Sequence, residues 1–225
     1  MTTILQRKTT MILLARAKWP RYATVKEDMC LKSSKWYGRY DNKRPVFHDN
    51  TGIDIAQPTD SFHQRITYSS YYGGNVAKGG VFIQLCGWLG TYDLYPGAIS
   101  DSDYLKNAGV FESQKDYQEK DGGIPFLNIV DRGYRITKAA WMAGQFVLQP
   151  IFSKSDRKFN TLETLKSSSI AADRSGNERS VRLCNNANIF RNSSKKCRTT
   201  SDIERVCDFW LTYSFQVNFM YKNCM

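Results

Sequence analysis

Three acidic residues, far apart in the chain, have the residue types and the flanking sequence that suit chemistry. Asp131 ends the apolar run Phe126–Val130, Asp49 follows the apolar pair 46–47, and Glu178 lies on a predicted helix. Converging carboxylates disfavour each other's ionisation unless a cation lies between them. Their oxygens suit Mg²⁺ or Mn²⁺. Two such ions can stabilise the attacking and leaving oxygens of an in-line phosphodiester displacement, without a histidine base.

Each of these acids can also have a purely structural role, and the sequence leaves the catalytic and the structural explanation open. Asp131 precedes a glycine turn and can start that turn or cap the following helix. Asp49 adjoins Asn50–Gly52, which we interpret as a break in the strand, where aspartate commonly forms a turn. Glu178 lies four residues after Arg174 and can form an exposed ion pair with it on a helix surface.

The elements that must position these acids are predicted from apolar patterns and turn residues. We expect strands near Val46, through a hairpin over Val81–Gly97 that turns at Leu89-Gly90, at Phe126–Val130 and at Gln145–Pro150. A helix over Leu162–Leu183 follows them. The fold class is therefore α/β, with an RNase H-like mixed five-stranded sheet flanked by helices. In this order the first and fourth strands are neighbours, so Asp49 and Asp131 would meet.

Other segments receive simpler predictions. The long helix should turn Leu162, Leu165, Ile170 and Ala171 toward the sheet. The remaining expected elements are a loop over Ser61–Gly80, a helix over Tyr104–Phe111 capped by 100–103, a charged loop over Gln114–Gly123, a short helix over Ile136–Ala143 and an aromatic closing helix over Ile203–Tyr221.

Composition limits the classes of partner. The chain has 225 residues and a net charge of +11, and 41% of its residues are hydrophobic, so we expect a globular protein with a polyanionic partner. No apolar run approaches the ~18 residues of a membrane span, and we recognise no signal peptide, so we expect an intracellular protein. None of the six cysteines forms a CxxC pair, which argues against structural zinc. Residues 1–43 form a basic, aromatic N-terminal segment ahead of a domain over 44–225.

Five motifs, taken in order, resemble the DDE-superfamily transposase and endonuclease domain of the Harbinger type. Asp49-Asn-Thr is similar to the first acidic motif, and Asp131-Arg-Gly-Tyr to the second. The segment from Arg174 to Arg179, with its arginine one turn before Glu178, is similar to the third. The tyrosine- and lysine-bearing stretch 64–78 and the segment 96–101 lie between the first and second motifs.

The resemblance implies cleavage of DNA that depends on Mg²⁺ or Mn²⁺ in a two-metal site, with strand transfer in a full transposase. It implies that Asp49, Asp131 and Glu178 are the catalytic metal ligands, with Asp101 as a secondary site residue. DNA, a separate DNA-recognition protein and a second copy of the chain are the expected partners, and the nucleus is the expected location. The residues expected to contact nucleic acid are Arg65, Tyr68, Tyr71, Lys78, Arg132, Arg174 and Arg179.

Two alternatives remain. Residues 1–43 show no DNA-reading signature, so the chain can be a truncated copy, a domesticated domain or a decaying remnant that binds DNA or protein without catalysis. The other alternative is a basic, sheet-rich protein whose acids coincide with the motifs by chance. The truncated, domesticated and decaying forms would all retain the three acids for a time.

Overall fold

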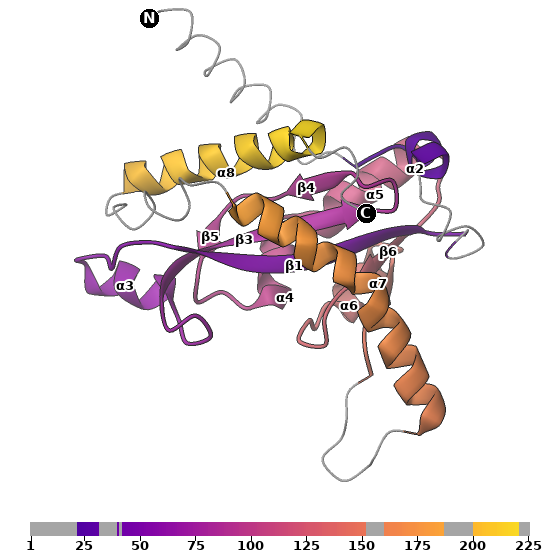
Figure 1. Ribbon diagram of the computed structural model, residues 1–225, viewed down its shortest axis with the longest axis horizontal. Coiled ribbons are helices and arrows are strands. Elements are labelled where there is room, and N and C mark those ends of the chain that lie inside the picture. The colour runs from indigo at the N-terminus through magenta and orange to yellow at the C-terminus, as the bar shows by residue number, and fades with distance from the viewer. Residues whose placement is uncertain (1–21, 32–39, 41, 152–159, 187–199, 221–225) are drawn as a thin grey trace, which may run out of the picture.

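The computed structural model describes residues 22–31, 40, 42–151, 160–186 and 200–220 (Figure 1). Within these ranges the protein is a mixed α/β structure in which helices flank a seven-stranded mixed sheet. The strands are β1 (Arg44–Asp54), β2 (Tyr68–Ser69), β3 (Gly74–Gln84), β4 (Leu89–Thr91), β5 (Tyr95–Pro96), β6 (Phe126–Ile129) and β7 (Phe146–Leu148). The helices are α2 (Val25–Leu31), α3 (Ser61–Thr67), α4 (Asp101–Asn107), α5 (Val110–Lys120), α6 (Thr137–Met142), α7 (Thr161–Asn185) and α8 (Thr200–Met220).

The sheet combines antiparallel and parallel pairing around β1. Its main path is β2-β3-β1-β6-β7, and β4 and β5 also pair with β3. β3 runs antiparallel to β1, β2, β4 and β5, whereas β6 is parallel to both β1 and β7. Between the parallel strands β6 and β7, α6 provides the crossover. Gly144, at a φ of 72°, ends this crossover in a left-handed conformation that glycine adopts readily.

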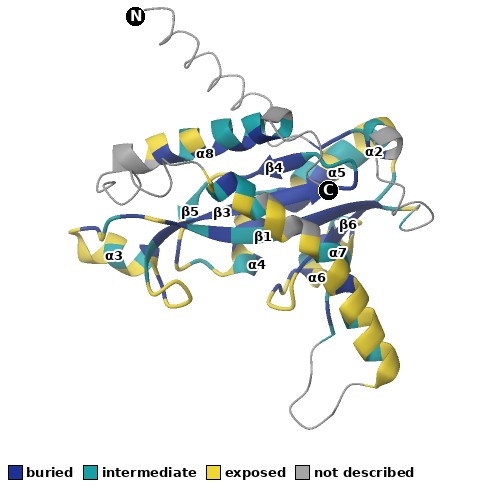
Figure 2. Cartoon of the chain, viewed as in Figure 1, coloured by how far each residue is buried: buried dark blue, intermediate teal, exposed yellow. Residues whose placement is uncertain are grey.

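Successive side chains of β1 and β3 point to opposite faces of the sheet, so the core is divided between these two faces. Val46 and Phe82 pack with residues of α4, α5 and α6 on one face. Phe47 and Ile83 pack with Ile170 of α7 on the other face, and Trp210 of α8 covers the sheet further along that face. In Figure 2 the central strands are accordingly buried, whereas α3 and the first turns of α7 are exposed. The apolar pattern of the sequence thus places α7 against the sheet.

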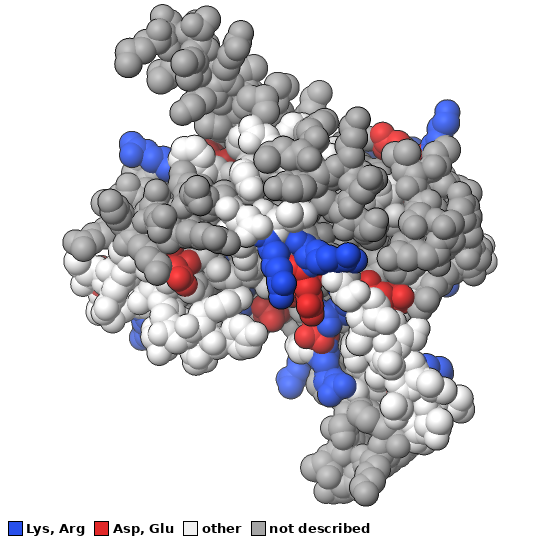
Figure 3. All heavy atoms as spheres, viewed as in Figure 1, with Lys and Arg blue, Asp and Glu red and all other residues white. Residues whose placement is uncertain are grey.

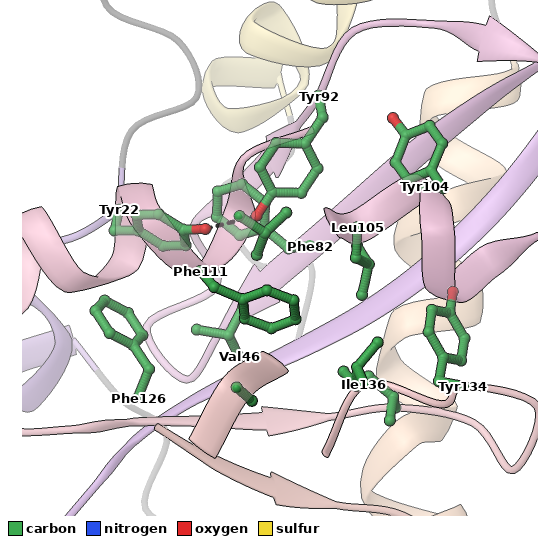
Figure 4. Close-up of a cluster of buried hydrophobic side chains, with 13 residues drawn as sticks. Tyr22, Val46, Phe82, Tyr92, Tyr104, Leu105, Phe111, Phe126, Tyr134 and Ile136 are labelled. Atoms are coloured by element: carbon green, nitrogen blue, oxygen red, sulfur yellow. Dashed lines mark hydrogen bonds between the residues drawn. The ribbon is translucent and has the colours of Figure 1, made fainter. Parts of the chain in front are cut away.

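The described part of the N-terminal segment packs into this same core. Tyr22 is fully buried, and its hydroxyl lies 2.6 Å from the hydroxyl of Tyr92 (Figure 4). The backbone N–H of Ala23 donates to Gln84, and the guanidinium of Arg44 donates to the carbonyl of Ala23. These contacts join residues 22–23 to the two central strands. Within the segment 1–43, residues 1–21, 32–39 and 41 lie outside the described residues.

Several of the predicted elements are confirmed. β6 is buried along its whole length, as the run 126–130 predicts, and Asp131 follows it directly. Ser100 caps α4 by accepting a hydrogen bond from the N–H of Asp103, but the predicted bounds 104–111 were wrong, because α4 ends at Asn107 and α5 begins at Val110. α6 and α8 are also present, although the predicted last residue of α8, Tyr221, lies outside the described residues. Strong local signals, such as caps and long apolar runs, were sufficient for these elements.

Other predictions were wrong, because tertiary pairing overrode the local signals. β1 is continuous through Asn50–Gly52, since β3 pairs with it from Val46 to Asp54. The predicted loop 61–80 contains α3, β2 and the start of β3, and the predicted loop 114–123 is mostly α5. The hairpin turns at residues 85–88, because Leu89 and Gly90 belong to β4.

The burial of β7 and of α7 also differs from the prediction. β7 lies at the end of the main strand path, and Phe146 is 47% exposed instead of buried. On α7, Leu162 and Leu165 are 70% and 61% exposed and Ala171 is exposed as well, so Ile170 alone of the four predicted residues packs against the sheet. The first turns of this helix extend beyond the sheet (Figure 1), so their apolar side chains have no sheet face to cover. None of the helices in the described ranges combines the length and apolarity of a bilayer crossing.

Candidate functional site

Asp49 occupies the middle of β1, not a turn. Because side chains alternate along a strand, it points to the same face as Phe47 and Thr51, which is the face that α7 covers. Burial raises the pKa of Asp49 to about 6, and the nearby negative charges of Asp131 and Asp101 act in the same direction. The positive charge of Arg174 opposes these effects. Asp49 is thus a half-buried carboxyl group with charged neighbours on several sides.

Asp131 lies just past the end of the neighbouring parallel strand β6, near Asp49 of β1. Phe47 pairs with Ile129 in the β1–β6 register, so two residues further along each strand bring Asp49 and Asp131 side by side. Asp131 lies just past the end of β6, and its carboxylate accepts a hydrogen bond of 2.7 Å from the N–H of Arg132. Its side chain is 57% exposed. The adjacency that the sequence predicted for these two acids therefore follows from the observed register.

α7 crosses β1 next to these two aspartates. Ile170 packs in one cluster with Phe47, and the side-chain amide of Asn185 donates to the hydroxyl of Thr51 over 2.6 Å. Between these contacts, Arg174 forms an ion pair of 2.9 Å with Asp131. The predicted placement of this helix over the sheet is confirmed.

Glu178 lies on the part of α7 that crosses the sheet. It is about one turn after Arg174 and two turns before Asn185, so all three share one side of the helix. This stretch of α7 lies opposite Asp49, because the two flanking contacts of the helix reach Phe47 and Thr51. The side chain of Glu178 is exposed, and Arg179 beside it is exposed as well. The structure thus brings Asp49, Asp131 and Arg174 together and leaves the Glu178 carboxylate at the open side.

Asp101 approaches the site from the opposite face of the sheet. Its carboxylate accepts hydrogen bonds of 3.0 Å from the side-chain amide of Asn50 and from the ammonium of Lys78. Lys78 is nearly buried, and its ammonium also donates to the carbonyl of Ile99. Lys78 therefore holds the start of α4 against the sheet, and a contact between Lys78 and nucleic acid stays a prediction.

Exposed aromatic side chains flank the site on the α3–β2 side. The ring of Tyr72 lies on Gly52 of β1, where an added Cβ would stand 2.8 Å from it. Tyr71, which is 87% exposed, packs edge-on against Tyr72 with 4.9 Å between the ring centroids. Tyr68 is half exposed, and Arg65 is exposed on α3. These residues form a surface that we name the tyrosine edge, consisting of Arg65, Tyr68, Tyr71 and Tyr72.

Sequence reasoning did not assign site roles to Asn50 or Tyr134, and it considered Tyr72 only as one of the loop tyrosines suited to base stacking. Asn50 and Tyr134 belong to the quoted motifs, which was the available signal, but motif position does not show which side chain points inward. Tyr72 follows Tyr71 in the same tyrosine-rich stretch. Its position on Gly52 depends on the pairing of β1 with β3, which a local pattern does not specify.

His48 belongs to a buried polar network beneath the site. It is fully buried on β1, and its Nε2 donates to the side-chain oxygen of Asn128 over 2.8 Å. Burial lowers its pKa to about 4, although this hydrogen bond raises it slightly. Asn128 also accepts a hydrogen bond from Gln114 of α5. This polar network holds β1, β6 and α5 together below the site.

The donor chemistry of the site fits a hard divalent cation, although the present grouping of side chains does not complete a metal site. All the acids are oxygen donors, and Asp49 is desolvated beside other carboxylates, which a cation would offset. Across the described ranges, no three His, Cys, Asp or Glu side chains are grouped so as to hold a metal ion. Acidic and basic side chains adjoin one another on this face (Figure 3), and Arg174 and Lys78 already pair with Asp131 and Asp101.

Comparisons of the chain with protein-family models, with curated proteins and with solved structures found no match.

Proposed function

We propose that this protein is a divalent-metal-dependent DNA nuclease of the transposase type, with Asp49, Asp131 and Glu178 as its carboxylate triad. The main support is that Asp131, just past the end of β6, lies near Asp49 on the adjacent parallel strand β1, while α7 carries Glu178 across the same place. The order β4-β3-β1-β6-β7, antiparallel before β1 and parallel after it, supports the RNase H-like part of the proposal. A half-buried aspartate with a raised pKa is also typical of a functional site.

In this proposal Asp49 and Asp131 bind Mg²⁺ or Mn²⁺ from the sheet, and Glu178 turns inward from α7 to complete the set. When bound, such ions activate a water or 3′-hydroxyl nucleophile and stabilise the leaving oxygen. Arg174 then releases Asp131 and becomes available to a DNA phosphate, which a guanidinium binds well. The tyrosine edge stacks on bases, and the net charge of +11 attracts the backbone. A DNA substrate, together with membership of this eukaryote-like family, would place the protein in the nucleus.

A plasmid-nicking assay tests this proposal. The native chain should nick supercoiled DNA with Mg²⁺ or Mn²⁺ and not in EDTA, and Asp131→Asn should reduce nicking to background, because an amide is a weaker ligand without charge. Asp116→Asn is the matched control, since Asp116 is an exposed acid on α5, which covers the other face of the sheet. Undiminished nicking by Asp131→Asn would refute the assignment.

The ion pairs of the site favour a second candidate, a non-catalytic DNA-binding or protein-docking module on the same fold. Arg174 and Lys78 already neutralise Asp131 and Asp101, so the site is electrostatically stable without a metal. This candidate predicts DNA binding that is equal with Mg²⁺ and with EDTA, and no nicking under either condition. Metal-dependent nicking by the native chain would eliminate it.

A further inference from the structure

The outer edge of β7 has the composition of a protein interior. Residues 139–153 form the longest part of the sequence without Asp, Glu, Lys or Arg. The next longest part, residues 79–92, lies on the central strands β3 and β4, whose residues there are mostly buried. β7 instead ends the strand path, and within the described residues it pairs with β6 alone. An uncharged stretch thus forms the rim of the sheet in a protein whose net charge is +11.

Large apolar side chains are exposed on both sides of this rim. Trp141 and Met142, at the end of α6, are each 75% exposed, and Phe146 of β7 is 47% exposed. Val147 packs against the core cluster on the α6 face, so Phe146 points to the opposite face, because side chains alternate along a strand. The ammonium of Lys43 lies 5.0 Å from the centroid of the Phe146 ring and covers part of it. Apolar surface therefore flanks β7 on both faces of the sheet.

The backbone of β7 also has polar groups that face the rim. The carbonyl of Leu148 accepts a hydrogen bond from the N–H of Val130, so the polar backbone groups of Leu148 point toward β6. Because successive residues of a strand direct these groups to opposite sides, the N–H and C=O of Val147 point away from β6. Natural proteins commonly block such an edge with charged side chains or proline, since it is a template for pairing with another strand. β7, which reads Phe-Val-Leu, contains neither.

We propose that β7 pairs with β7 of a second copy of this chain, so that the two sheets join across a twofold axis. The two strands run antiparallel and are centred on Val147, whose N–H and C=O each bond to Val147 of the other copy. In this register Phe146 of each copy lies opposite Leu148 of the other, on the same face of the joined sheet. The pairing uses the same surface of both copies and is therefore complete with two chains.

Charge and area favour a second copy as the occupant of the rim. An uncharged surface offers nothing to a polyanion, whereas two copies with a net charge of +11 repel each other least where neither carries a charge. Trp141, Met142 and Phe146 together expose roughly 400 Å² in each copy, so a symmetric contact covers roughly 800 Å² before flanking residues are counted. This is close to the roughly 1,000 Å² that a specific interface requires, which predicts a dimer of modest affinity.

The proposed interface lies apart from the surfaces already assigned. β2 and β7 are the two ends of the strand path, so the tyrosine edge beside β2 stays open in the dimer. The inference does not depend on the proposed nuclease activity, and the nicking assay and a measurement of association can fail independently.

Sedimentation velocity of the whole chain over a concentration series tests the inference. The native chain should shift from monomer to dimer as its concentration rises through the micromolar range. Phe146→Lys should weaken the dimer by roughly 10-fold or more, because it removes apolar contact and adds charge twice in a symmetric interface. Met142→Lys should weaken it as well, and because Met142 is exposed on a helix, the fold of this variant should be unchanged.

Phe62→Lys is the matched control, since Phe62 is 55% exposed on α3, beyond the other end of the strand path. It should leave the dimer intact. Equal weakening by this variant would overturn the inference, because added charge in general would then be the cause. A native chain that stays monomeric at about 100 μM would also overturn it, as would a dimer that neither Phe146→Lys nor Met142→Lys weakens.

Hydrogen exchange at the amide of Val147 gives a second measurement. In the native chain this amide should exchange several-fold more slowly as the concentration rises, because its N–H becomes bonded to the second copy. Protection that is already complete in the monomer would show that another part of the chain covers the edge, and would overturn the inference.

Discussion

At the scale of single residues, Asp49 stands out because its position lowers the stability of the fold. The strand holds a carboxyl group in a half-buried place, where burial and two other aspartates favour its protonated form. Proteins retain such unfavourable charges mainly at functional sites. Arg174 offsets part of the cost and is itself largely buried.

The free energy of unfolding should therefore depend on pH through the ionisation of Asp49. The pKa of Asp49 in the folded protein is about 6, above its ordinary value of 3.8. Its stabilising contribution is therefore complete below pH 4 and is lost as the pH rises through 6. Asp49→Asn removes this loss, so at pH 8 in EDTA its free energy of unfolding should exceed that of the native chain by about 1–3 kcal/mol.

Urea unfolding at pH 4 and at pH 8 measures the difference, which should disappear at pH 4. Asp103→Asn is the control with the opposite sign. Hydrogen bonds from Ser100 and Lys106 lower the pKa of the exposed Asp103, so this variant should be less stable than the native chain at pH 8. An Asp49→Asn variant that is less stable at pH 8 would show that the carboxylate is not desolvated.

At the scale of elements, α7 decides whether the three acids can meet. Its capping box at Asn160 and Glu163 begins the helix, and its contacts at Ile170 and Asn185 hold it across the sheet. The exposed side chains of Leu162 and Leu165 contribute little to that attachment. The part of α7 from Ile170 to Asn185 is therefore its anchor.

Shortening one side chain in each part of α7 tests which part holds the helix against the sheet. Ile170→Ala should lower the free energy of unfolding by about 2–4 kcal/mol, because it removes a buried side chain between α7 and β1. Leu165→Ala should change it by less than about 0.5 kcal/mol, since Leu165 is exposed. Urea denaturation measures both values, and equal losses would contradict the proposed anchor.

At the scale of the whole molecule, charge and the tyrosine edge should govern nucleic-acid binding. The net charge of +11 predicts an affinity for nucleic acid that falls steeply as the salt concentration rises, since binding releases counterions.

Tyr71→Ala should weaken binding to a single-stranded oligonucleotide by about 1–3 kcal/mol through lost stacking. Trp141→Ala is the control, since Trp141 is similarly exposed but lies on α6. Fluorescence anisotropy over a salt series measures the salt dependence and the effect of Tyr71→Ala. Salt-independent binding would contradict the role of charge, and equal losses in Tyr71→Ala and Trp141→Ala would contradict the role of the tyrosine edge.

The sequence by itself determined those features that depend on local physics. The buried strand before Asp131, the cap of α4, the crossover at α6 and the long helix α7 all follow from apolar runs, capping residues and glycine positions. The same patterns predicted that Asp49 and Asp131 are neighbours. These features were predictable because short-range propensities and the packing of the core favour the same structure.

Only the tertiary structure decided the features that depend on pairing between distant segments. β3 keeps β1 continuous through Asn50–Gly52, because a complete ladder of hydrogen bonds outweighs the turn propensity of these residues. The same pairing places Asp49 in mid-strand and gives Tyr72 its place on Gly52. The exposure of Glu178 and the burial of the Tyr134 hydroxyl likewise arise where α7 and α4 approach the sheet. Such placements depend on contacts between residues far apart in the chain, which no local pattern specifies.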